Sequence, residues 1–207
     1  MARAVSSFLR EARGVAALEF ALIAPILAVL IYGLIEMTLR FRAADEYQRY
    51  LQQAGDYLSR EDELFSSDID EIYAASSQMI RSASLSGNLH LDVASIGFKT
   101  DGSPELLWQR HRGDTPPAFD LGEADGLGAP GESVLRVSAR FSYETPSSQI
   151  IGAGRMNLDD AVYFRPRVTR LIAIDGQIHD DGADWVNDGD STAAPNNGED
   201  AVGTVEP

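Results

Sequence analysis

Residues 15–35 read VAALEFALIAPILAVLIYGLI, an apolar run whose one charged residue is Glu19 and which also contains Pro25 and Gly33. An α-helix rises about 1.5 Å per residue, so this run is roughly 32 Å long and matches the hydrocarbon thickness of a bilayer. We therefore predict a transmembrane helix over residues 15–36. Proline is tolerated inside a membrane helix, so Pro25 is expected to kink the helix and to have no chemical role.

The two flanks of this run carry similar numbers of basic residues, so charge does not decide how the helix is oriented in the membrane. The lengths of the segments on either side decide it instead. Residues 1–14 contain three arginines and one glutamate, and Arg40, Arg42 and Arg49 follow the run. Long segments are exported largely regardless of charge, so we expect a cytoplasmic leader and an external bulk. A cleaved secretory signal is the alternative, but the run exceeds the usual apolar length and Ala43-Ala44 would be a poor cleavage site.

Helical periodicity continues beyond the apolar run. One apolar face recurs at i, i+3, i+4, i+7 and i+11, which predicts a single helix to about Leu58; its members are Tyr47, Tyr50, Leu51, Ala54 and Leu58. A second amphipathic helix is predicted to begin at a capping box of Ser67 and Asp70 and to end near Gly87-Asn88.

After Gly87 the pattern becomes that of strands. Apolar and polar residues alternate over 89–98 and 135–143, a short strand is predicted at 105–110, and 160–174 reads as a strand interrupted by Pro166. Between them, 113–131 reads as a long loop rich in Gly and Pro. One strand face is apolar, and the other, which carries Arg136 and Ser138, is polar and expected to face solvent. This predicts an antiparallel sheet covered by helices on one side. The fold class is therefore α+β, with an extracytoplasmic domain over 37–174.

The last segment, 175–207, has a different composition. It holds nine acidic residues and no basic one, within a chain of 207 residues and net charge −15. Such a segment cannot bury enough apolar surface to offset its ordering entropy, so we predict a disordered acidic tail. A calcium site among Asp180, Asp181, Asp184, Asp188 and Asp190 is the alternative, although their spacing matches neither an EF-hand loop nor a glycine-rich nonapeptide repeat.

Charge and residue content exclude several functions. The strong acidity argues against a nucleic-acid partner, and the absence of cysteine excludes disulfides and thiolate metal sites. His90, His111 and His179 stand apart without metal-ligand spacing, and no nucleophile elbow or phosphate-binding loop occurs. We therefore predict no enzyme activity, no cofactor and no metal.

An acid such as Glu19 is costly inside a membrane and has two explanations. It lies five residues into the run, so it could reach the lipid headgroups and have no function. If the chain were cut after Gly14, however, Val15 would carry a new α-amine one helical turn from Glu19. The acid could then pair with its own amine or with that of a neighbouring subunit, which would fix the register of helix packing.

A basic leader, Gly14, the pair Glu19-Phe20 and an apolar helix with Pro25 together resemble the start of the TadE-like minor pilins, or pseudopilins, of tight-adherence (Tad/Flp) pilus systems. The resemblance covers about residues 10–40. It implies a bacterial inner-membrane protein, cleavage by a prepilin peptidase after Gly14, and Val15 as the mature terminus. Glu19 and Phe20 would serve processing and assembly, with other pilins and Tad assembly components as partners of the helix.

Two other functions remain open from the sequence. The chain could be a signal-anchored periplasmic binding or enzymatic domain, or a membrane scaffold of a secretion apparatus that never enters a fibre. A TadF-like assignment is not separated from a TadE-like one by these residues.

Overall fold

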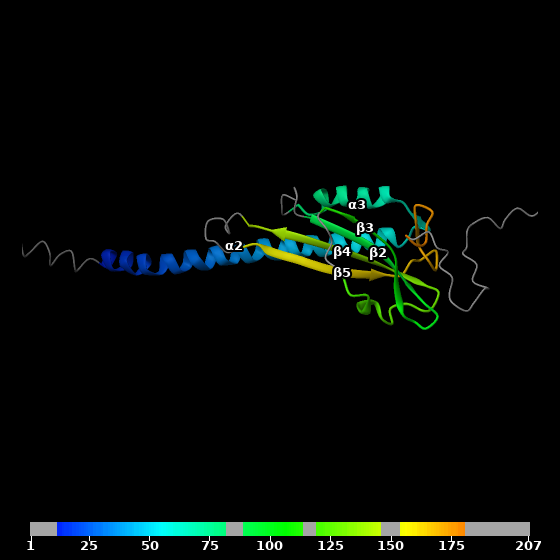
Figure 1. Ribbon diagram of the computed structural model, residues 1–207. Helices are drawn as coiled ribbons and strands as arrows, with labels where there is room; N and C mark the ends of the chain where they lie inside the picture. Colours follow the sequence, from blue (N-terminus) through cyan, green and yellow to red (C-terminus); the bar gives the residue numbers. More distant parts are fainter. Residues whose placement is uncertain (1–11, 82–88, 114–118, 146–153, 181–207) are drawn as a thin grey trace, which may run out of the picture.

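The computed structural model describes residues 12–81, 89–113, 119–145 and 154–180. A long helix projects from a domain in which two helices lie against a four-stranded sheet (Figure 1). This confirms the α+β class with an N-terminal apolar helix, a second helix and a small antiparallel sheet.

Helix α2 spans Ala12–Leu58 without interruption and includes Pro25. Its first half stands clear of the domain and its second half lies on the sheet (Figure 1). All five residues predicted to form its apolar face are buried, and Ala43 extends that face by one turn. The prediction of one helix from the apolar run to Leu58 is confirmed. The helix continues because no helix-breaking residue separates the apolar run from the amphipathic face that follows it.

Helix α3 spans Ser66–Met79. The predicted capping box of Ser67 and Asp70 is wrong. The Asp68 carboxylate accepts a hydrogen bond from the Phe65 backbone N–H at 2.8 Å, so the helix begins earlier, and Asp70 instead pairs with Arg112 of β3. The helix ends at Met79, short of the predicted end; residues 82–88 lie outside the described part of the chain.

The sheet has the order β3-β2-β4-β5, and every neighbouring pair is antiparallel. Its strands are β2 (Leu89–Phe98), β3 (Pro104–Arg112), β4 (Ser133–Tyr143) and β5 (Met156–Phe164). Two short strands, β1 (Glu63–Leu64) and β6 (Ala173–Ile174), form a separate parallel pair. The predicted last strand is therefore wrong in its bounds, because the chain leaves the sheet before Pro166, which has no N–H to donate to a ladder.

The main core lies between the helices and one face of the sheet. The buried side chains of α2 and α3 pack against alternate residues of β2 and β4, such as Leu91, Val93, Val137 and Phe141. The alternation predicted for these strands is confirmed on this face.

The opposite face is less exposed than expected. Arg136 and Ser138 were predicted to face solvent, but both are buried, together with Asp92 on the neighbouring strand. The segment from Phe119 through the short 3₁₀ helix η1 (Leu121–Ala124) accounts for this, because it lies over the sheet and places the Phe119 ring 4.2 Å from the Arg136 guanidinium.

The chain keeps contact with the domain just past Ile174, where the acidic tail was expected to begin. The Asp175 carboxylate accepts hydrogen bonds from the backbone N–H and hydroxyl of Ser66 at 3.0 and 2.5 Å, and these bonds lower the pKa of Asp175. Asp180 pairs with Arg110 at 2.8 Å. The rest of the predicted tail and of the calcium candidates, residues 181–207, lies outside the described residues.

Candidate functional site

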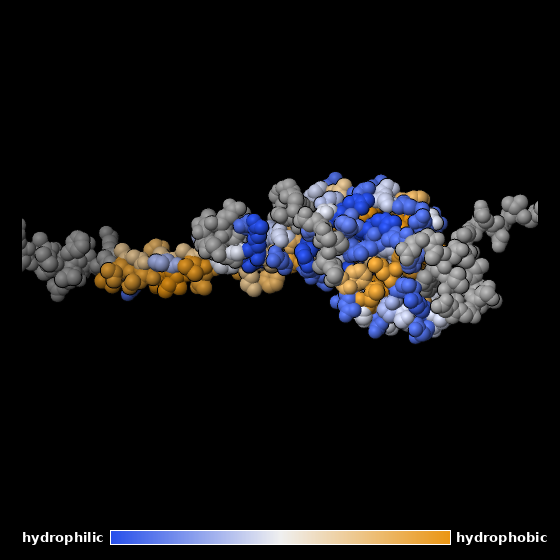
Figure 2. Space-filling model, in the orientation of Figure 1, coloured by the Kyte–Doolittle hydropathy of each residue, from blue (hydrophilic) through white to orange (hydrophobic). Residues whose placement is uncertain are grey.

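The projecting half of α2 exposes large apolar side chains around its whole circumference. Leu18, Phe20 and Val29 are 65, 69 and 71 % exposed, and the apolar window of this helix contains no buried residue. In Figure 2 this half of the helix forms an almost unbroken hydrophobic rod. A globular protein does not present such a surface to water. Within the described residues, α2 is the one helix long and apolar enough to cross a membrane.

All the sequence-predicted site residues lie on this helix near its tip. Gly14 and Val15 belong to its first turn, which begins at Ala12. Glu19 and Phe20 follow one turn later, and both side chains are exposed. The helix continues through Pro25, which also faces outward.

The first turn is the least secured part of α2. The first four N–H groups at a helix start have no acceptor within the helix, and in α2 those of residues 12–14 are among them. The bond between Gly14 and Val15 therefore lies where the backbone can leave the helix at the lowest cost. Glu19 lies further along, where its N–H can bond to the carbonyl of Val15.

A polar cluster at the middle of α2 joins the projecting half to the sheet. The Thr145 hydroxyl donates to the Glu36 carboxylate at 2.6 Å, and the Arg40 guanidinium donates to the same oxygen at 2.8 Å. Thr145 is buried and lies two residues past Tyr143, the end of β4. Sequence analysis missed this cluster, since nothing in the local pattern pairs Glu36 with a residue 109 positions away.

Further contacts hold the second half of α2 on the sheet. The Tyr47 hydroxyl donates to the Ala139 carbonyl, and Gln48 donates to Asp160 at 2.8 Å. Burial raises the pKa of the Tyr47 hydroxyl above its ordinary value. Gly55 allows the ring of Phe164 to approach the helix where a Cβ atom would overlap it. These contacts hold the second half of α2 against β4 and β5.

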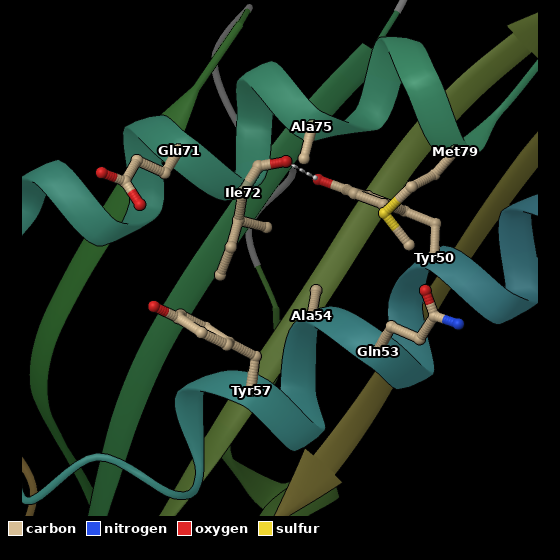
Figure 3. A pocket seen from close by; sticks show the side chains of 8 residues that line it. All are labelled: Tyr50, Gln53, Ala54, Tyr57, Glu71, Ile72, Ala75 and Met79. Atoms are coloured by element: carbon tan, nitrogen blue, oxygen red, sulfur yellow. Dashed lines mark hydrogen bonds between the residues drawn. The ribbon is translucent and has the colours of Figure 1, made fainter.

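An apolar groove of about 380 Å³ lies between α2 and α3 (Figure 3). Tyr50 donates to the Ile72 carbonyl across it at 3.3 Å, and Tyr57 and Glu71 stand at its rim. The remaining lining is formed by Gln53, Ala54, Ala75 and Met79. These lining residues do not include a nucleophile paired with a base. The groove could therefore hold an apolar group by contact, but its lining does not form a catalytic site.

The described residues provide no metal cluster of three or more His, Cys, Asp or Glu side chains. The buried pair on the outer face of the sheet, Asp92 and Arg136 at 3.1 Å, is enclosed by Gln109, Ser138 and the Phe119 ring. Burial raises the pKa of Asp92 even though Gln109 and Arg136 oppose this effect. The pair is structural in its setting, since side chains cover it on all described sides.

Comparison with known proteins gives one finding for this chain. Residues 14–55 match the family model described as TadE-like protein. No curated protein and no solved structure matches this chain. The match confirms the resemblance to the TadE-like family, covers all the predicted site residues, and extends along α2 into the part that packs on the sheet. It supports a pilus-related, minor-pilin-like role for a membrane-anchored chain.

Proposed function

Because residues 14–55 match the TadE-like family, we propose that this chain is a minor pilin or pseudopilin that takes part in assembling a Tad/Flp pilus. The observation that carries the proposal is the exposed apolar half of α2 with Gly14, Glu19 and Phe20 at its tip. Residues 1–14 are the leader, 15–36 the membrane span, 37–174 the periplasmic domain and 175–207 an acidic tail. The bulk of the chain lies outside the inner membrane.

In this proposal a prepilin peptidase cuts the bond after Gly14. The position of this bond in the first turn of α2 supports the step, because unwinding one turn exposes it while the rest of the helix keeps its hydrogen bonds. Gly14 also lowers the helical propensity of that turn by about 1 kcal/mol relative to alanine. Cleavage leaves Val15 with a charged amine one turn from Glu19.

Assembly then uses the exposed half of the mature helix. Small and large apolar side chains on all sides suit packing among other membrane helices, including those of other pilins. A carboxylate such as Glu19 is costly in that setting unless a positive group meets it. The amine of Val15, its own or that of a neighbouring subunit, is the group that the spacing provides, so Glu19 would fix the register between helices.

The processing step is tested by sequencing the amino terminus of the protein recovered from membranes. We expect the mature chain to start at Val15 and Gly14→Ala to accumulate at full length. Gly33→Ala is the matched control, because it makes the same change in the same helix where a Cβ atom has open space around it. A mature terminus at any other residue, or normal cleavage of Gly14→Ala, would refute the processing site.

The assembly step is tested by separating membranes from sheared surface filaments. Glu19→Ala should insert into the membrane as the wild type does but should reduce pilus production. Glu19→Gln keeps the size and removes the charge, so it should behave like Glu19→Ala if pairing with an amine is the function. Equal pilus production by wild type and both variants would contradict this role.

The groove between α2 and α3 favours a second candidate, a signal-anchored periplasmic binding domain with no part in assembly. That candidate predicts an uncleaved leader and normal pili in a strain lacking the chain. A non-fibre membrane scaffold is the third candidate. It predicts cleavage and pilus loss on deletion, with the chain itself absent from sheared filaments.

A further inference from the structure

The apolar surface of α2 does not stop where the predicted membrane span ends. Leu34, Met37 and Phe41 are 68, 55 and 63 % exposed, and their spacing of three and four residues puts them on one helix face. Asp45, the next residue on that face, pairs with Arg49 at 2.7 Å. We call Leu34, Met37 and Phe41 the proximal stripe. It continues the apolar rod to the edge of the folded domain.

The opposite side of the same turns is already covered by the sheet. Ala43 and Tyr47 are 0 and 1 % exposed, and the Glu36 carboxylate accepts hydrogen bonds from both Arg40 and Thr145. The first core residue of the domain thus follows Phe41 by two positions. No flexible spacer separates the apolar rod from the domain.

The length of α2 fits this arrangement to a bilayer. Ile35 and Phe41 are about 9 Å apart along the helix axis. The headgroup region on one side of a bilayer is roughly 5–8 Å thick. If Ile35 lies at the hydrocarbon boundary, Met37 lies among the headgroups and Phe41 at their outer edge. Ala43 and the domain then begin at the lipid surface.

The charges at this end of the domain are balanced, in contrast to the net charge of −15 of the chain. Across residues 34–49, 143–145 and 154–156, four arginines each pair with an acid. These pairs are Arg40–Glu36, Arg42–Glu46, Arg49–Asp45 and Arg155–Glu144. A surface without net charge can approach anionic headgroups without the repulsion that the acidic chain as a whole would meet.

We propose that the proximal stripe and the end of the domain beside it lie directly on the outer headgroups of the membrane that holds α2. The partner is a lipid surface, with Met37 inserted among the headgroups and Phe41 in contact with their outer edge. This inference rests on the proposed membrane span. It adds that the domain is held against the bilayer surface, because no linker lets it move away.

The absence of cysteine from the chain allows a direct test. Single cysteines at Leu27, Met37, Phe41 and Gln52 are labelled with an environment-sensitive fluorophore in the full chain. The protein is reconstituted in vesicles of phosphatidylethanolamine and phosphatidylglycerol containing a headgroup-level or a deep quencher. Gln52 is the matched control, because it is exposed and lies eleven residues, about three turns, beyond Phe41 on the same face.

We expect headgroup-level quenching at Met37 and Phe41 to be several-fold stronger than at Gln52, and deep quenching to be strongest at Leu27. Quenching at Met37 and Phe41 no stronger than at Gln52, with Leu27 quenched, would overturn this inference alone. An unquenched Leu27 would instead overturn the membrane span of the proposed function. Protection at Met37 and Phe41 that is insensitive to quenching lipid and disappears on dilution of the protein would assign the stripe to a second copy.

A substitution separates insertion from simple proximity. Phe41→Glu should weaken headgroup-level quenching of a label at Met37, since it places a charge at the outer edge of the headgroups. Gln52→Glu adds the same charge further along the same face and should leave that label unchanged. Both positions are exposed, so neither change is expected to unfold the domain. Equal quenching in the two variants would show that Phe41 does not contact the headgroups.

Discussion

Replacing Asp92 by alanine is expected to destabilise the domain by about 3–5 kcal/mol, the usual cost of leaving a buried charge without its partner. The side chains of Asp92 and Arg136 are 3 and 7 % exposed and lie 3.1 Å apart. Without the carboxylate, Arg136 keeps the Ser138 hydroxyl at 2.8 Å and the Phe119 ring, and its Nε atom already lacks a hydrogen-bond partner. Its charge would then have no counter-ion.

The loss can be measured by chemical or thermal unfolding of the full chain in detergent. Trp108 is fully buried in β3 and donates to the Ile172 carbonyl at 2.8 Å, so its fluorescence reports the folded sheet. A Trp185→Phe background leaves Trp108 as the single indole. For a domain of this size, 3–5 kcal/mol corresponds to a fall in Tm of roughly 6–20 °C.

Two further variants test the reasoning. Asp92→Asn keeps the size of the side chain and can still accept from Gln109, so its loss should be smaller than that of Asp92→Ala. Adding Arg136→Met to Asp92→Ala removes the orphaned charge and should recover most of the stability, because a buried pair is worth little against apolar packing. The raised pKa of Asp92 agrees, since burial there outweighs the attraction of Arg136. A loss below about 1 kcal/mol for Asp92→Ala, or a double variant worse than the single one, would refute this account.

Three other substitutions give expected outcomes by the same unfolding assay. Asp175→Ala should lower the free energy of unfolding by about 0.5–2 kcal/mol, because it removes both hydrogen bonds to the first turn of α3. The pKa of Asp175 is lower in the folded protein than its unfolded value of 3.8. The stability difference between wild type and variant should therefore be present above pH 3.8 and vanish as the pH falls through the folded-state pKa. Gly55→Ala should cost about 1–3 kcal/mol because its Cβ would overlap the Phe164 ring. Thr145→Val should cost about 1.5–3 kcal/mol by removing a hydrogen bond to the Glu36 carboxylate. In each case an unchanged unfolding midpoint would contradict the contact named.

The helices were predictable because their signals are local. The apolar run and the face from Tyr47 to Leu58 share one helical period with no proline or glycine between Glu36 and Ala54, and the structure keeps them as one helix. The match over residues 14–55 likewise rests on a short contiguous motif.

The remaining features depend on pairs that are distant in the chain. The alternation of polar residues around Arg136 is typical of a strand with one face in solvent. Nothing in the sequence near Phe119 indicates that this segment covers Arg136. The start of α3 was misplaced because the sequence offers both Asp68 and Asp70 as capping residues. In the structure Asp70 pairs with Arg112 of β3, and Asp68 caps the helix.

The continuity of α2 has a mechanical consequence. Leu58 lies about 26 Å beyond Phe41 along the helix axis, and α2 is bonded to the sheet over much of that length. Membrane helices tilt by about 20° on average, and a change of that size would sweep the far end of the domain sideways by roughly 9 Å. Rotation of the anchor about its own axis would turn the domain by the same angle. The molecule would thus act as a lever, in which lipid thickness or a neighbouring helix at the tip sets the direction in which the sheet faces.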